Sequence, residues 1–77
     1  MIELDLKGLN CPLPVLKTKK FLMGIDANTQ ICVYTTDPSS INDLKDFCNK
    51  TGNILLSQSQ KNGIITTVIQ RKISTHN

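Results

Sequence analysis

The sequence has few aromatic or imidazole side chains: no tryptophan, one tyrosine, two phenylalanines and one histidine among 77 residues. Proteins that bind single-stranded nucleic acid stack bases on several aromatic side chains within a dense basic surface. Here nine basic and six acidic residues give a net charge of only +3. Direct binding of nucleic acid is therefore not expected, whereas a mild positive charge suits docking on an acidic protein surface.

Long apolar runs are also absent. No stretch approaches the roughly 18 apolar residues that a membrane-spanning helix needs. The N-terminal sequence MIELDL lacks the basic segment and apolar run of a signal peptide. We therefore expect a cytoplasmic protein that does not enter the membrane. The length predicts a single domain over residues 1–77, with a core at about 3–72 and a loose tail at 73–77.

The chain has three cysteines, Cys11, Cys32 and Cys48, separated by 21 and 16 residues. A secreted disulfide scaffold normally has an even and denser set. No two cysteines form a C-x-x-C pair, and the single histidine, His76, lies in the tail, so no metal site is expected. A chain this short cannot enclose a large cofactor and still keep its core, so no cofactor is expected. Any chemistry therefore depends on a surface side chain.

The apolar pattern alternates between the two-residue period of strands and the longer period of helices. It predicts strands at residues 2–6, 29–35, 53–60 and 64–72, and helices at about 12–23 and 38–51. Asp37 is expected to cap the second helix, with Pro38 as its first residue and Gly52 as its left-handed end. The segment Lys61-Asn62-Gly63 predicts a hairpin turn.

This order predicts an α+β fold, a two-layer βαβαββ sandwich with both helices on one face of the sheet. The last two strands should form an antiparallel hairpin, and the first helix should connect parallel neighbours. The expected buried positions on the helices are Val15, Thr18, Leu22, Ile25, Ile41, Leu44 and Cys48. Cys32, in the middle of a strand, and Cys48 are both interpreted as residues of the core or its edge.

Cys11 lies where the first helix begins. The unpaired amides and partial positive charge of a helix N-terminus lower the pKa of a thiol, and Lys17 would add positive potential. Pro12 is predicted at the first helical position, and Pro14 falls in the first turn, where its missing N–H breaks no hydrogen bond. Gly8 is expected to permit a close approach of the preceding strand. The alternative is that Cys11 is a small buried hydrophobic residue.

Residues 4–14, with the sequence LDLKGLNCPLP, resemble the signature of the TusA/SirA-like family of sulfur carriers, a C-P-x-P box after a Gly-Leu pair. The resemblance covers about residues 3–72, including the strand end at Thr36-Asp37-Pro38 and the closing hairpin. It implies that the sheet is mixed and four-stranded. It also implies that Cys11 accepts sulfane sulfur as a persulfide, with Pro12 and Pro14 as the motif prolines and Asp37 at a recurrent acidic position.

The resemblance further implies a cysteine desulfurase or rhodanese-like protein as sulfur donor, and a downstream relay protein as acceptor. Such a carrier is a sulfurtransferase-type shuttle and not a self-contained enzyme. In the best-known branch the sulfur reaches 2-thiouridine in tRNA; other branches serve molybdenum cofactor assembly, sulfur oxidation or selenium metabolism. Leu13 and Asn10 replace the Glu and the basic residue of the tRNA branch. Because charges at the rim of an interface govern docking, the sequence leaves the pathway open.

Two other functions are weighed against the carrier. In the first, the chain is a non-enzymatic regulatory or interaction module that binds protein or nucleic acid through Lys17, Lys19 and Lys20. These lysines are expected to be a solvated face first and a docking patch second. In the second, it is a thiol-disulfide redox enzyme, which needs a resolving thiol near Cys11 that no neighbouring residue supplies. The sequence favours the carrier.

Overall fold

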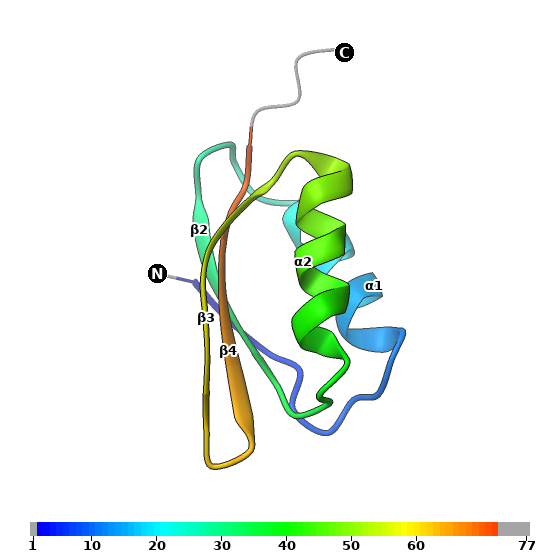
Figure 1. Ribbon diagram of the computed structural model, residues 1–77. Helices are drawn as coiled ribbons and strands as arrows, with labels where there is room; N and C mark the ends of the chain where they lie inside the picture. Colours follow the sequence, from blue (N-terminus) through cyan, green and yellow to red (C-terminus); the bar gives the residue numbers. More distant parts are fainter. Residues whose placement is uncertain (1, 73–77) are drawn as a thin grey trace.

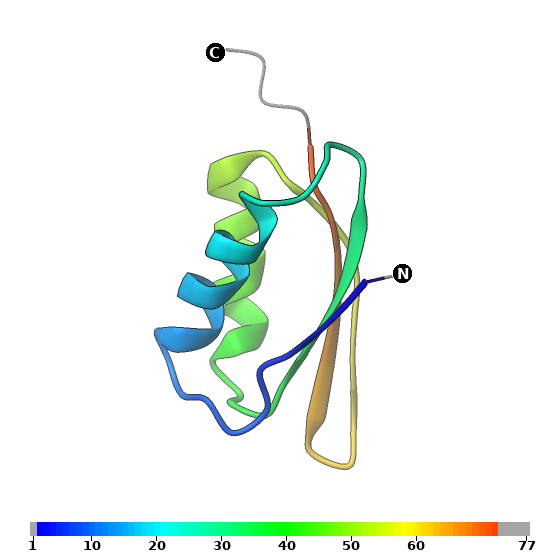
Figure 2. The ribbon, with the colours of Figure 1, turned by 180° about the vertical axis from the view of Figure 1, so that it is seen from behind.

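The computed structural model describes residues 2–72, so the predicted loose tail at 73–77 lies outside the described residues. Six elements follow in the predicted order: β1 (Ile2–Asp5), α1 (Leu13–Leu22), β2 (Gln30–Thr35), α2 (Ser40–Thr51), β3 (Ile54–Lys61) and β4 (Ile64–Gln70). The strands form one sheet, and both helices cover the same face of it (Figures 1 and 2). The predicted α+β two-layer sandwich is confirmed.

The sheet is mixed, with the strand order β1-β2-β4-β3. β1 and β2 are parallel neighbours joined through α1, whereas β4 pairs antiparallel with both β2 and β3. The β3–β4 hairpin turns through Asn62 and Gly63, whose φ angles are 54° and 79°. Two consecutive left-handed residues are typical of the type I′ turn that joins twisted strands, so the predicted hairpin is confirmed.

The core lies between the helices and the sheet. On β2, Ile31, Val33 and Thr35 are each 0% exposed, as the alternating pattern predicts. The main core cluster consists of Leu6, Leu22, Ile31, Val33, Leu44, Phe47, Cys48 and Ile69. Burying an aliphatic or aromatic side chain of this size stabilises a fold by about 1.5–3 kcal/mol, so a few such residues hold both helices on the sheet.

The buried positions of Cys32 and Cys48 agree with the sequence prediction. Cys48 lies in the core with 2% of its surface exposed, and burial raises the pKa of its thiol to about 11. Cys32 lies on the opposite face of β2 and is 8% exposed, with Glu3 and Val68 as its neighbours on the adjacent strands. On this face, the Tyr34 hydroxyl donates a hydrogen bond of 2.8 Å to the Glu3 carboxylate.

α1 begins one residue later than predicted. Pro12 is the N-cap residue, with φ −96° and ψ 11°, and not the first helical residue. The Leu16 N–H donates to the Pro12 carbonyl at 3.1 Å, and this bond closes the first turn from Leu13. Pro14 lies in that first turn, as predicted, and is buried. Its missing N–H therefore costs no helical hydrogen bond.

α2 begins two residues later than predicted, so the placement of Pro38 at the first helical position is wrong. The Ser40 N–H donates to the Asp37 carbonyl at 2.9 Å, which closes a turn that precedes the helix. Pro38 is the second residue of this turn, a position that its fixed φ angle favours. Gly52 ends α2 in the left-handed conformation at φ 82°, as predicted.

Within residues 2–72, neither helix has the length and apolar character needed to cross a lipid bilayer.

Candidate functional site

Cys11 lies in the loop between β1 and α1 and is exposed, whereas the other two cysteines are buried. The alternative interpretation of Cys11 as a buried hydrophobic residue is therefore wrong. The loop reaches α1 through a turn in which the Leu13 N–H donates to the Asn10 carbonyl at 2.9 Å. The protein thus presents a single exposed thiol at the N-terminal end of a helix.

Two hydrogen bonds join the Cys11 loop to the loop between β2 and α2. The Cys11 N–H donates to one carboxylate oxygen of Asp37 at 2.7 Å, while the other oxygen accepts the Ser39 N–H at 3.1 Å. The Gly8 N–H donates to the Thr36 hydroxyl at 2.9 Å. Two backbone donors hold the pKa of Asp37 below its usual value. The predicted capping of α2 by Asp37 is wrong, because Ser39 is the N-cap residue of α2 and no side chain caps the helix. Asp37 instead stabilises the turn before α2 and fixes the backbone of Cys11.

Gly8 is required for its backbone conformation. Its φ angle is +86°, a left-handed value that is costly for residues with a Cβ atom. Beyond its two chain neighbours, no residue has an atom within 4 Å of the place where a Cβ would stand. The predicted close approach at Gly8 is therefore wrong, and the residue serves to turn the chain between β1 and Cys11.

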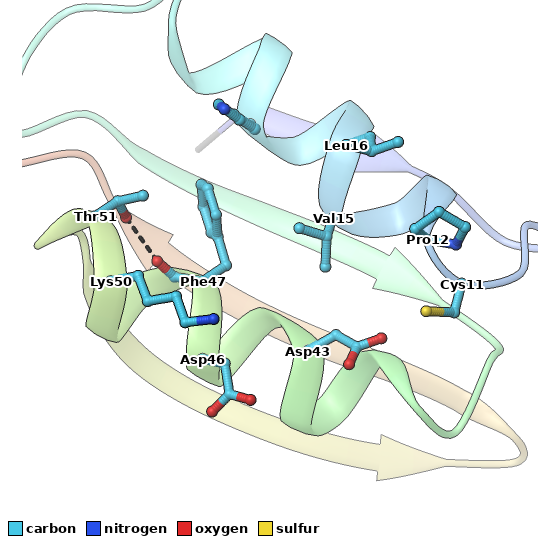
Figure 3. Close-up of a pocket in the computed structure, with 10 residues that line it drawn as sticks. Cys11, Pro12, Val15, Leu16, Asp43, Asp46, Phe47, Lys50 and Thr51 are labelled. Atoms are coloured by element: carbon cyan, nitrogen blue, oxygen red, sulfur yellow. Dashed lines mark hydrogen bonds between the residues drawn. The ribbon is translucent and has the colours of Figure 1, made fainter.

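A groove of about 480 Å³ runs between α1 and α2, with Cys11 at one end (Figure 3). Its lining residues are Cys11, Pro12, Val15, Leu16, Lys19, Asp43, Asp46, Phe47, Lys50 and Thr51. Asp43 lies beside Cys11, whereas Lys50 and Thr51 lie towards the other end. The groove therefore combines apolar walls with an acidic end at the thiol.

The carboxylates of α2 and of its preceding loop raise the pKa of the Cys11 thiol. The largest cause is Asp43, which favours the protonated thiol by accepting its hydrogen bond. Desolvation and the negative charges of Asp43 and Asp37 act in the same direction, and only a hydrogen bond from Ser39 opposes them. The predicted lowering of this pKa is wrong, because the carboxylates of Asp43 and Asp37 favour the protonated thiol.

The three lysines of α1 lie on two sides of the helix. Lys19 lines the Cys11 groove, whereas Lys17 and Lys20 line a separate hollow between α1 and Leu4 of β1. The expectation that Lys17 adds positive potential at Cys11 is therefore not met, because residue 17 faces away from the groove. A docking patch made of all three lysines would have to extend around the helix.

The acidic and basic residues of α2 in the groove were not predicted as site residues. Asp43, Asp46 and Lys50 are spaced by three and four residues, so they share one face of a helix. That spacing is a signal in the sequence, but it identifies the site only once α2 is known to pack beside Cys11. Among residues 2–72, no three His, Cys, Asp or Glu side chains come together in a way that would hold a metal ion.

The family model for the sulfurtransferase TusA matches residues 2–71. The chain belongs to the TusA family. The resemblance seen in the sequence is thereby confirmed, and the family supports a role as a sulfur carrier that interacts with sulfur donor and acceptor proteins.

Individual relatives agree with this assignment over nearly the whole chain. A protein of Neisseria meningitidis serogroup A is 41% identical over 69 residues, which cover 90% of this chain and 93% of that protein. The sulfur carrier protein TusA of Allochromatium vinosum is 39% identical over 69 residues, with 90% and 91% covered. The crystal structure of a SirA-like protein from Desulfitobacterium hafniense superimposes with a TM-score of 0.82 at 27% identity, covering 95% of this chain and 100% of that one.

Proposed function

We propose that Cys11 is the sulfur-carrying residue of a cytoplasmic relay, where it accepts sulfane sulfur as a persulfide from one protein and passes it to another. The observation that supports this most directly is the exposure of Cys11 at the end of the interhelical groove, with Cys32 and Cys48 buried. Membership of the TusA family supports the same role.

The chemistry needs only one nucleophile on this chain. The Cys11 thiol loses its proton to water, and the thiolate attacks the outer sulfur of the donor's persulfide. The new S–S bond forms as the donor's own S–S bond breaks, and the departing donor thiolate takes up a proton. An acceptor thiolate then attacks the outer sulfur on Cys11 in the same way. The Cys11 sulfur is oxidised in the first step and reduced in the second, so no other oxidant is consumed.

Four residues near Cys11 support this role through the backbone. Asp37 and Gly8 fix the loop through the hydrogen bonds described above. Pro12 and Pro14 remove two N–H groups from the start of α1 and restrict its backbone. We assign these four residues to positioning the thiol.

We propose a cysteine desulfurase or a rhodanese-like protein as the donor and a downstream relay protein as the acceptor. The acceptor belongs either to tRNA thiolation or to another branch of sulfur trafficking. Asn10 and Leu13 flank the Cys11-Pro12 pair and are exposed, Leu13 by 42%. These neutral side chains would contact the acceptor and contribute to the choice of branch.

Sulfur loading tests this proposal. Reduced protein is incubated with a cysteine desulfurase, pyridoxal phosphate and cysteine, and its intact mass is measured. We expect a gain of one sulfur atom in the wild type and in Cys32→Ser, and no gain in Cys11→Ser. An absence of gain in the wild type, or a gain that survives Cys11→Ser, would contradict the proposal.

A further inference from the structure

The carboxylate of Asp43 lies beside Cys11 without a cation of its own chain. Asp43 is half-buried in the groove between the helices, and Figure 3 shows its side chain and that of Cys11 pointing towards one another. Among the residues that the structure describes, the one ion pair is between Lys7 and Asp5, at 3.6 Å. The Asp43 carboxylate can therefore form an ion pair with a positive charge of another molecule, at the point where sulfur would be exchanged.

The other charged groups near Cys11 come from three parts of the chain. The loop before α2 supplies Asp37, whose two oxygens are already occupied by backbone N–H groups. α2 supplies Asp43 and Asp46 on the groove. The lysine of α1 in the groove, Lys19, lies two helical turns beyond Pro12, about 10 Å along the helix axis.

The remaining cation of the groove, Lys50, lies towards its other end, beside Thr51 (Figure 3). The thiol end of the groove is therefore acidic in the isolated protein. A neighbouring carboxylate that accepts the thiol proton's hydrogen bond disfavours the Cys11 thiolate in the isolated protein. A cation that pairs with Asp43 would remove that restraint.

We propose that Asp43 is a recognition residue that binds a lysine or arginine side chain of the protein exchanging sulfur with Cys11, and that this ion pair releases the Cys11 thiolate. The identity of the partner as a sulfur donor or acceptor rests on the proposed function. The Asp43 carboxylate pairs with the partner's cation, the thiol proton passes to water, and the thiolate attacks the partner's sulfur. The free carrier thereby keeps its thiol protonated until a partner of matching charge docks.

Two small disulfides of similar length test the charge recognition directly. Cystamine carries an ammonium group at each end, whereas bis(2-hydroxyethyl) disulfide is neutral. Each forms a mixed disulfide with Cys11 and releases a thiol, and intact mass spectrometry at pH 7 gives the two rate constants. The ratio of the constants is compared between proteins, because the two reagents differ in intrinsic reactivity. The proteins are the wild type, Asp43→Asn and the groove control Asp46→Asn.

We expect the rate constant for cystamine, divided by that for the neutral disulfide, to fall about two- to fivefold in Asp43→Asn. This is the effect expected from the loss of one exposed ion pair. The same ratio should stay unchanged in Asp46→Asn. An unchanged ratio in Asp43→Asn, or an equal fall in both variants, would overturn the proposal. Asp43→Ser, tolerated in a first helical turn, repeats the test if Asn disturbs folding, which far-UV circular dichroism detects.

The pH profile of alkylation by iodoacetamide, a neutral reagent, tests the restraint on the thiol. The midpoint for Cys11 should lie at lower pH in Asp43→Asn than in the wild type and in Asp46→Asn; coincident midpoints overturn the proposal. Neither experiment uses sulfane sulfur. Failure of sulfur loading with a clear Asp43 effect would therefore refute the proposed function alone, and the converse result would refute only the role of Asp43.

Discussion

The carboxylate of Asp37 accepts the backbone N–H of Cys11 at 2.7 Å, across 26 residues of sequence. The same carboxylate caps the turn that leads into α2. The cysteine loop is therefore fixed by a residue of a different loop, through its backbone and not through its sulfur. This arrangement holds the backbone of Cys11 in place and leaves its side chain exposed.

Replacing Asp37 with alanine should destabilise the fold. The substitution leaves the N–H groups of Cys11 and Ser39 without their acceptor and separates the two loops. Thermal unfolding followed by circular dichroism should give a lower midpoint for Asp37→Ala than for the wild type. Asp46→Ala, which removes an exposed carboxylate of α2, is the control and should change the midpoint less. An equal fall of the unfolding midpoint in both variants would mean that the hydrogen bonds of Asp37 do not stabilise the fold.

The low pKa of Asp37 predicts a dependence of stability on pH. A carboxyl group whose folded pKa lies below its unfolded value of about 3.9 stabilises the fold fully above that value. The contribution is lost as the pH falls through the folded pKa. Between about pH 5 and pH 2, the unfolding midpoint of the wild type should therefore fall more steeply than that of Asp37→Asn. If the unfolding midpoints of the two proteins fell equally with pH, Asp37 would not be the cause of the acid sensitivity.

The fold was largely predictable because it depends on local patterns. Residues that are close in the sequence were enough to predict the strand with Ile31, Val33 and Thr35 on one face. The same holds for the hairpin turn at Asn62-Gly63. Helix starts were predicted less well, because a proline suits both a first helical position and a preceding turn. The TusA-like motif located the candidate cysteine without showing its surroundings.

The electrostatics of the site could not be predicted from the Cys11 segment. The position of Cys11 at the start of a helix indicates a lowered thiol pKa, whereas Asp43, which lies beside it, raises that pKa. This proximity arises from the packing of α1 against α2, which no local pattern specifies. For the same reason, the sequence did not separate Lys19, which lines the groove, from Lys17, which does not.

The helical layer should depend on Leu44, which is 0% exposed, far more than on Leu16, which is 54% exposed. Leu44→Ala leaves a cavity in the core and should lower the free energy of unfolding by about 2–5 kcal/mol. Leu16→Ala, the same change on a helix surface, should stay within about 0.5 kcal/mol. Urea unfolding of both variants provides the measurement, and similar values for the two leucines would be incompatible with this packing.

Gly8 and Gly24 should differ in their tolerance of a methyl group. Gly8→Ala places a Cβ in a left-handed conformation and should cost about 1–2 kcal/mol, although the space around it is open. Gly24→Ala meets only ordinary contact, 3.7 Å from the Phe21 carbonyl oxygen, and should be nearly neutral. The comparison uses urea unfolding of both variants. A neutral Gly8→Ala would show that the loop adopts another conformation.

Charge reversal should affect sulfur loading only on the groove side of α1. Lys19 shares the groove with Cys11, so Lys19→Glu should slow loading by the donor about two- to fivefold by weakening docking. Lys17→Glu makes the same change in net charge but lies in the other hollow, and should have a smaller effect. Initial loading rates at low carrier concentration give the comparison. Equal slowing would indicate attraction by overall charge and not contact in the groove.

The contrast between one exposed and two buried cysteines gives the protein an internal reporter of its own folding. In the native state a thiol reagent meets a single accessible thiol, while global unfolding uncovers two more. The number of sulfur atoms labelled in a brief pulse therefore measures the folded fraction of the chain without an added probe. The same contrast directs oxidation of thiols in the folded protein to Cys11, whose exposed sulfur can be restored by thiol–disulfide exchange.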